Sequence, residues 1–237
     1  MNAHRVEHAV ILPINHPTFF PLSVAEQDDW LRANNDRQAR LMEASSGRFI
    51  AYADVRIDGP YEEPAALRAE LERAVSTLHL RGVKLHPYNL NTVATDRRLR
   101  PAIHAADRLG IPIVVDSNPQ AGAPDLAGLS PVAIQQATRG VSVPWIVAHL
   151  GGDAYEESVG SAGFVDVSGT LLRLEQRLGP GGCRELLRRI GIDRVLFGSD
   201  IPIFDYDAYA ALFDRLALRP DELERIAYTN AARLLGI

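Results

Sequence analysis

Residues 98–116, RLRPAIHAADRLGIPIVVD, contain a helix pattern followed by a strand pattern, and this pair indicates the fold class. In Arg98–Leu109 apolar residues recur at steps of three and four, which is typical of a helix with one buried face. Ile111–Val115 is apolar almost throughout, as expected of a strand buried on both faces of a parallel sheet. Asp116 follows at the strand end. The stretch predicts one repeating unit of an α/β protein.

The same alternation of short apolar runs and helix patterns extends along the chain. Strict alternation predicts parallel strands joined by right-handed crossovers. No linker or low-complexity stretch interrupts it, so residues 1–237 are predicted to form a single domain. The seven predicted strands are Ala9–Ile14, Phe49–Val55, Val83–Leu85, Ile111–Val115, Trp145–Ala148, Phe164–Val167 and Arg194–Phe197.

Two further helix patterns have clear apolar faces. Pro64–Leu78 is predicted to bury Leu67, Leu71, Ala74 and Leu78. Pro220–Leu235 opens with Pro-Asp-Glu, as a helix start often does, and ends at Gly236. Its predicted apolar face consists of Leu223, Ile226, Ala227, Leu234 and Leu235.

Composition and charge exclude several classes of protein. The chain is 46% hydrophobic and 23% charged with a formal net charge of −5, and it has no basic run that would bind nucleic acid. No apolar run approaches the ~20 residues of a membrane span. The single cysteine, Cys183, excludes an internal disulfide and favours a cytoplasmic location. Its Gly-rich surroundings predict a half-buried thiol at a helix start rather than a nucleophile.

Polar residues that can carry chemistry follow six of the apolar runs. One such residue alone can be a cap or can satisfy loop amides. Six strands that end this way predict one cavity at the carboxyl ends of a parallel sheet, where α/β proteins place their active sites. The strand ends are Asn15-His16, Lys84-Leu85-His86-Pro87, Asp116-Ser117, Ala148-His149-Leu150-Gly151-Gly152, Asp166-Val167-Ser168-Gly169 and Gly198-Ser199-Asp200-Ile201-Pro202.

Four of these strand ends and the closing segment of the chain, in this order, resemble the amidohydrolase-related metal-dependent hydrolases, the branch that includes aminocarboxymuconate-semialdehyde decarboxylase. They are Lys-Leu-His-Pro, Ala-His-Leu-Gly-Gly, Asp-x-Ser-Gly, Phe-Gly-Ser-Asp-x-Pro and the closing Asn-Ala-Ala-Arg-Leu-Leu-Gly. The resemblance covers nearly the whole chain. It implies a TIM-type (β/α) barrel, of which about seven of eight strands are present, rather than an open doubly wound sheet.

The resemblance also implies roles for individual residues. His149 corresponds to a metal ligand or acid/base, and Asp200 to a metal ligand and proton acceptor. Lys84 and His86 are expected to bind substrate, and Asn15 is a further candidate donor for an anionic ligand. The implied cofactor is a divalent metal, most often Zn²⁺ in the family, which activates a water molecule or orients the substrate.

The sequence departs from the family at two places. The family's first strand carries His-x-His, which is absent here; His4 and His8 precede the first run and are expected on a helix. The second departure is Asp116, which stands where the family usually has a histidine. Asp116, His149 and Asp200 are therefore the remaining candidate metal ligands. This oxygen-rich set suits Mn²⁺ or Mg²⁺ as well as Zn²⁺ and predicts weak or absent metal binding, with Lys84 as a counter-charge.

Two functions remain open. The first is a hydrolase or decarboxylase that acts on a small carboxylate or cyclic substrate through a metal-activated water. The alternative is a catalytically inactive barrel that binds a small anionic ligand. The expected partners are a small-molecule substrate and a second copy of the chain, because a missing strand would leave unpaired edges at Ala9–Ile14 and Arg194–Phe197. Neither nucleic acid nor a membrane is expected as a partner.

Overall fold

The computed structural model describes residues 1–14, 24–117 and 127–237, and this part of the chain divides into two compact units. Unit 1 comprises Met1–Asp116 and Gln136–Trp145, and unit 2 comprises Ser117–Gln135 and Ile146–Ile237. Within the described residues, no helix has the length and apolar character needed to cross a membrane.

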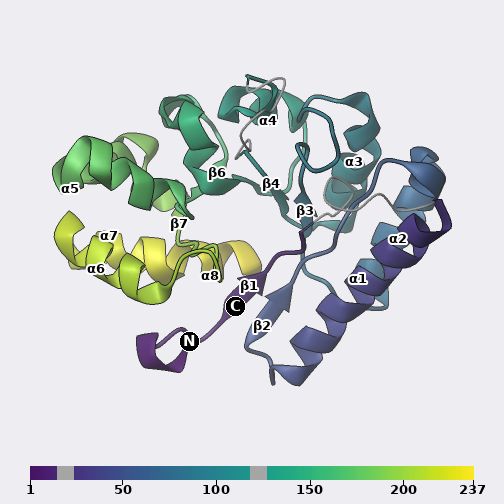
Figure 1. The fold of residues 1–237 in the computed structure, drawn as a ribbon, viewed down its shortest axis with the longest axis horizontal. Helices are drawn as coiled ribbons and strands as arrows, with labels where there is room; N and C mark the ends of the chain where they lie inside the picture. The colour runs from purple at the N-terminus through teal and green to yellow at the C-terminus, as the bar shows by residue number, and fades with distance from the viewer. Residues whose placement is uncertain (15–23, 118–126) are drawn as a thin grey trace. The chain divides into compact units, whose positions relative to one another are not determined.

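Unit 1 consists of two parallel strand pairs with helices packed beside them (Figure 1). Strand β1 pairs with β2, β3 pairs with β4, and a parallel bridge joins Ala53 to Val83. Helix α2 packs against both α1 and α3. The elements are η1 (Asn2–His4), β1 (Ala9–Ile11), α1 (Val24–Ala44), β2 (Phe49–Ala51), η2 (Gly59–Glu62), α2 (Pro64–Ser76), β3 (Val83–Leu85), η3 (Arg97–Leu99), α3 (Arg100–Leu109) and β4 (Ile113–Val115).

The core of unit 1 follows the predicted helix face. Leu67, Leu71 and Ala74 of α2 are buried, whereas Leu78 lies beyond the helix end and is half-buried. The expectation for the N-terminal histidines was wrong in part, because η1 includes His4 but not His8. A buried hydrogen bond links α1 to α2, since the Asn35 side chain donates to Glu70 at 2.9 Å.

Unit 2 contains three parallel strands, in which β6 lies between β5 and β7. Helix α5 packs against α6 and η5. Two elements cross the boundary between the units: α4 ends in unit 1, and β5 begins there. The elements of unit 2 are η4 (Ala127–Leu129), α4 (Pro131–Ala137), β5 (Trp145–Val147), η5 (Ala148–Gly160), β6 (Phe164–Asp166), α5 (Thr170–Ile190), η6 (Ile192–Arg194), β7 (Val195–Leu196), α6 (Tyr206–Leu216), α7 (Pro220–Glu224), the π-helical η7 (Arg225–Thr229) and α8 (Asn230–Leu235).

Helix α5 bends at Gly179, where the backbone leaves the helical region before Pro180. Cys183 follows in the second segment, so the predicted turn before a helix is confirmed. The thiol is fully buried rather than half-buried, and burial raises its pKa to about 11. A thiol with so high a pKa is almost entirely protonated at neutral pH, which argues against a role as nucleophile.

The C-terminal segment is helical as predicted, but its buried face differs from the predicted one. Leu223 and Ala227 are exposed, whereas Glu222, Ile226 and Asn230 are buried. The buried polar positions have partners elsewhere in the fold, Arg188 for Glu222 and backbone carbonyls for Asn230, and a π-helical turn spans Arg225–Thr229 between them. The same turn leaves the carbonyl of Ile226 to accept a hydrogen bond from the Phe197 amide at 2.9 Å, next to β7.

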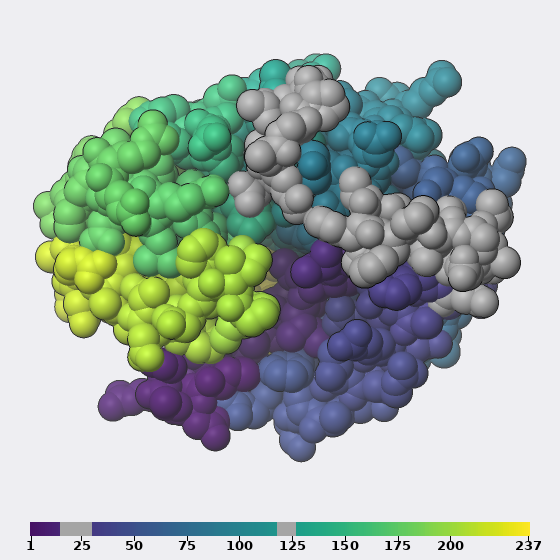
Figure 2. Space-filling model, viewed as in Figure 1, coloured from purple at the N-terminus to yellow at the C-terminus, as the bar shows by residue number. Residues whose placement is uncertain are grey.

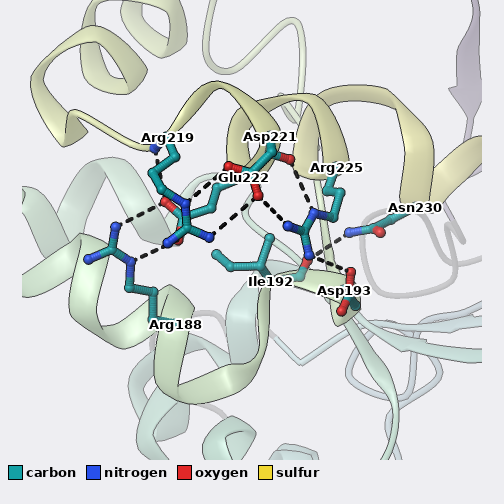
Figure 3. Close-up of polar contacts among 8 residues, drawn as sticks. All are labelled: Arg188, Ile192, Asp193, Arg219, Asp221, Glu222, Arg225 and Asn230. Carbon is teal, nitrogen blue, oxygen red and sulfur yellow. Dashed lines mark hydrogen bonds and ion pairs between the residues drawn. The ribbon is translucent and has the colours of Figure 1, made fainter.

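A polar network fastens this segment to the rest of unit 2 (Figure 3). The buried carboxylate of Glu222 accepts two hydrogen bonds from Arg188 of α5, at 2.9 and 3.0 Å. Arg225 bridges Asp221 and Asp193. The Asn230 side chain donates to the carbonyls of Ile192 and Val195, at 2.7 and 2.8 Å. These contacts hold the helix against the end of α5 and the start of β7.

The strands described in both units lie within the predicted apolar runs, and every strand pair within a unit is parallel. The prediction of an α/β fold with parallel strands is thereby confirmed. The closed TIM-type barrel and the single domain remain predictions.

Candidate active site

In unit 1, three predicted site residues meet at the carboxyl ends of β3 and β4. Leu85 pairs with Val115 in the parallel register, so the residues that follow them, His86 and Asp116, leave neighbouring strands at the same edge of the sheet. Asp116 Oδ2 lies 3.4 Å from Lys84 Nζ and 3.8 Å from His86 Nε2. The structure thus brings the two predicted substrate-binding residues to one predicted metal ligand.

Lys84 is 2% exposed and is the only lysine in the chain. A buried ammonium needs a counter-charge, because removal of water from an unpaired ion is costly. Asp116 supplies that charge, as predicted from the sequence. The pairing also gives Asp116 a cation as its neighbour, which weakens its attraction for a metal ion.

Sequence reasoning missed two buried ionisable residues that follow β2. Asp54 and Arg56 are each 1% exposed. Asp54 accepts a hydrogen bond from the Asn34 side chain at 2.7 Å, yet burial raises the pKa of its carboxyl to about 7. Arg56 forms two hydrogen bonds to Asp58, at 2.9 and 2.6 Å. The available signal was the charged Asp54 inside the apolar run Phe49–Val55.

In unit 2, His149 stands at the carboxyl end of β5 with a left-handed backbone, φ 56°. Its amide donates to Asp166 Oδ1 at 3.1 Å. Its ring Nδ1 lies 3.1 Å from the carbonyl oxygen and 3.0 Å from the hydroxyl of Ser168. The Ser168 hydroxyl in turn donates to Asp166 Oδ1. His149 is therefore held by the Asp-x-Ser-Gly motif that ends β6.

Asp200 lies beside the same motif. Its Oδ2 is 3.7 Å from the point that a Cβ on Gly169 would occupy, and Gly169 directly follows Ser168. The Gly169 amide donates to the hydroxyl of Tyr209 at 2.5 Å. Burial raises the pKa of Tyr209, which keeps the hydroxyl neutral. His149 and Asp200 thus both border residues 168–169, while their direct approach within one water's reach remains a prediction.

The described residues do not form a metal centre. No three side chains of His, Cys, Asp or Glu gather at one point in residues 1–14, 24–117 and 127–237. The candidate ligands are divided, with Asp116 in unit 1 and His149 and Asp200 in unit 2. His149 offers the single nitrogen of this set, and Asp116 is paired with Lys84. The fourth predicted contact residue, Asn15, lies outside the described residues.

Unit 2 contains a hollow of about 190 Å³. Its border includes Ser117, Gly151, Asp153 and Glu157. None of the predicted site residues that the structure describes lines it. The candidate site therefore rests on the strand ends rather than on this hollow.

Comparison with known proteins identifies the family. The sequence model of the family described as amidohydrolase matches residues 11–237. The chain belongs to this amidohydrolase family, as its motifs predicted. No curated protein matches the sequence.

Several solved structures have a similar fold at low sequence identity. 2,6-Dihydroxybenzoate decarboxylase from Rhizobium has a TM-score of 0.75 at 18% identity, over 100% of this chain and 86% of that one. Dihydroxybenzoic acid decarboxylase from Polaromonas, solved with bound manganese and an inhibitor, has a TM-score of 0.77 at 15% identity, over 100% and 83%. 4-Oxalomesaconate hydratase from Rhodopseudomonas palustris has a TM-score of 0.70 at 18% identity, over 100% and 78%.

Proposed function

We propose that this chain is an enzyme of the amidohydrolase family that hydrolyses or decarboxylates a small carboxylate or cyclic substrate. The observation that carries the proposal is the buried Lys84 ammonium, which shares Asp116 with His86 at the carboxyl ends of β3 and β4. An ammonium has three hydrogen-bond donors, so it can serve Asp116 and a substrate carboxylate together. The family match and the similarity to two decarboxylases and a hydratase support the class of reaction.

The proposed catalytic residues are His149 and Asp200. In a decarboxylation the bond to the carboxylate breaks, CO₂ leaves, and the remaining carbon takes a proton from an acid. In a hydrolysis a base instead accepts a proton from the attacking water. The ordinary pKa of histidine lies near 6.5, so an imidazole can act as acid or base near neutral pH. Asp200, as a carboxylate, is the proposed proton acceptor.

A divalent metal is part of the proposal only in a weakly bound form. The similar decarboxylase from Polaromonas holds manganese. In this chain the described residues lack a gathered ligand set, and Lys84 competes for Asp116. We therefore expect weak or absent metal binding at Asp116, His149 and Asp200. The TIM-type barrel is likewise proposed, on the strength of the fold of the similar proteins.

The alternative function is an inactive member of the family that binds a small anion without turnover. The Lys84–Asp116 pair favours it, because a buried ammonium at a strand end binds anions whether or not chemistry follows. Both functions share the same binding residues. They differ in the fate of the ligand.

Lys84 offers a clean test, because it is the only lysine in the sequence. Protein labelled with ¹³C at lysine Cε gives one side-chain signal, which is followed during titration with 2,6-dihydroxybenzoate as the probe. CO₂ release and resorcinol formation are measured in parallel, with and without added Mn²⁺ or Zn²⁺. A shifted signal with turnover that His149→Gln abolishes supports the enzyme. A shift without turnover supports the binding protein.

A panel of aromatic and dicarboxylic acids extends the test beyond one probe. His104→Gln is the matched control for His149→Gln, because it changes an exposed histidine of α3. We expect the control to leave turnover unchanged. If no acid in the panel shifts the Lys84 signal or is consumed, both functions are contradicted.

A further inference from the structure

The contacts of His149 determine which of its two ring nitrogens carries the proton. Nδ1 lies 3.1 Å from the carbonyl oxygen of Ser168. A carbonyl oxygen can accept a hydrogen bond but cannot donate one, so Nδ1 must be the donor in this contact. In the neutral imidazole the other nitrogen, Nε2, then keeps a lone pair.

The hydroxyl of Ser168 agrees with this assignment. It donates its single proton to Asp166 Oδ1, so it can meet the imidazole only as an acceptor. Nδ1 of His149 lies 3.0 Å from this hydroxyl oxygen. The carbonyl and the hydroxyl of one residue thus both require a proton on Nδ1. Both side chains are buried, with 9% of His149 and 6% of Ser168 exposed, so water competes little for these contacts.

Asp166 fixes the backbone on both sides of this contact. Its Oδ1 accepts the amide of His149 at 3.1 Å and the amide of Ser168 at 3.0 Å. One carboxylate oxygen therefore joins the end of β5 to the end of β6. It also supports the left-handed backbone of His149, which a residue with a side chain adopts only when its surroundings hold it there.

We infer that Asp166 and Ser168 are positioning residues that hold His149 in the Nδ1–H tautomer and present Nε2 as its reactive nitrogen. The reactivity of Nε2 rests on the proposed function, whereas the assignment of the tautomer does not. With Nδ1 donating to Ser168, Nε2 carries the lone pair through which the neutral ring can accept a proton. Histidines that act through one nitrogen are commonly oriented by a hydrogen bond at the other.

The test is the ¹⁵N spectrum of the whole chain labelled at histidine. It is recorded roughly two units above the ordinary histidine pKa of about 6.5, where the ring is neutral. The couplings of each ring nitrogen to the two ring protons identify which nitrogen is protonated, and the His149→Gln variant assigns the signals. We expect a protonated Nδ1 and an unprotonated Nε2 for His149. A protonated Nε2 in the unmodified chain overturns the inference, without the need for any further variant.

Two substitutions separate positioning from general stability. Asp166→Ala should shift His149 toward a mixture of tautomers, because it removes the oxygen that accepts the Ser168 hydroxyl, and that hydroxyl can then donate to Nδ1. Ser158→Ala is the matched control: Ser158 is also buried, but its hydroxyl donates to the carbonyl of Leu150 at 2.8 Å and not to the imidazole network. It should leave the tautomer unchanged. An equal shift in both variants would contradict the positioning role.

The inference and the proposed function can fail separately. An Nδ1–H tautomer in a chain without turnover supports the positioning role and contradicts the enzyme. Turnover of the probe by a chain in which Nε2 of His149 is protonated supports the enzyme and contradicts the positioning role.

Ser168→Thr, which keeps the hydroxyl, should retain the tautomer of the unmodified chain.

Discussion

Gly198 lies so close to Asp166 that a methyl group on its Cα would stand 3.1 Å from Asp166 Oδ1. The same methyl would lie 3.2 Å from the Cβ of Ser168. The absence of a side chain at Gly198 therefore lets the chain after β7 approach the residues that hold His149. The Phe-Gly-Ser-Asp motif contains this glycine for a packing reason that the sequence did not reveal.

Gly198→Ala should consequently destabilise unit 2. An inserted methyl in a filled site costs about 1–3 kcal/mol, because neighbours must shift. Urea unfolding measures the loss. The control is Gly181→Ala in α5, where no atom lies within 4 Å of the new methyl, and alanine should leave stability unchanged or raise it by about 0.5–1 kcal/mol. Equal effects at the two positions would contradict the packing argument.

Asp54 should make stability depend on pH. Burial raises the pKa of its carboxyl from 3.8 to about 7. Between these values the folded chain binds a proton that the unfolded chain releases, so stability falls as the pH rises through this window. Each unit of raised pKa corresponds to about 1.4 kcal/mol.

Asp54→Asn removes this dependence, because an amide does not ionise. We expect the stability of the variant relative to the unmodified chain to increase between pH 5 and pH 8, as measured by urea unfolding at both values. Other titrating groups are common to both proteins and cancel in the difference. A difference that stays constant with pH would show that Asp54 is ionised throughout.

Glu222 and its neighbour Asp221 should differ in their contribution to stability (Figure 3). The side chain of Glu222 is 2% exposed and that of Asp221 is 51% exposed. Glu222→Ala leaves the Arg188 hydrogen bonds unmade and should cost about 1.5–3 kcal/mol. Asp221→Ala removes exposed ion pairs, which water and salt screen, and should change stability much less.

The pKa of Glu222 predicts how stability changes with pH. Hydrogen bonds from Arg188 lower the pKa of the Glu222 carboxyl to about 2. The stabilisation is therefore complete above the ordinary value of 4.5 and is lost progressively as the pH falls toward about 2. The destabilisation by Glu222→Gln, from urea unfolding, should be smaller at pH 3 than at pH 7. A larger effect at pH 3 would refute the assigned charge state.

Strand β1 should take part in self-association. In unit 1 the described neighbour of β1 is β2, bonded through Ala9 and Ile11. Val10 and Ile14 are 38% and 63% exposed, and the N-terminal segment, in purple, is visible at the surface in Figure 2. Soluble proteins rarely leave an apolar strand edge uncovered.

We expect a homo-oligomer in sedimentation equilibrium that Val10→Lys dissociates. A lysine there places a charge at the proposed contact. The control is Val132→Lys, which charges an exposed valine of α4, 58% exposed, and should leave the oligomer intact. A monomeric unmodified chain would refute this prediction.

Much of the fold could be predicted because its signals are local. The apolar runs and the helix spacings of Pro64–Leu78 follow from side-chain periodicity, and the structure places parallel strands and α2 there. Local spacing failed at Pro220–Leu235, where Glu222 is buried and Leu223 is exposed. The buried face includes Glu222 and Asn230 because each has a polar partner, Arg188 or the carbonyl of Val195, that lies far away in the sequence.

The sequence by itself determined which side chains end the strands, and hence that Lys84, Asp116, His149 and Asp200 are candidate site residues. Only the tertiary structure decided how they are partnered. Strand register brings Lys84 to Asp116, and the left-handed backbone after β5 brings His149 to Ser168. The physical reason is that periodicity along one chain fixes the residue at a strand end, whereas hydrogen bonds and ion pairs depend on distances between different strands.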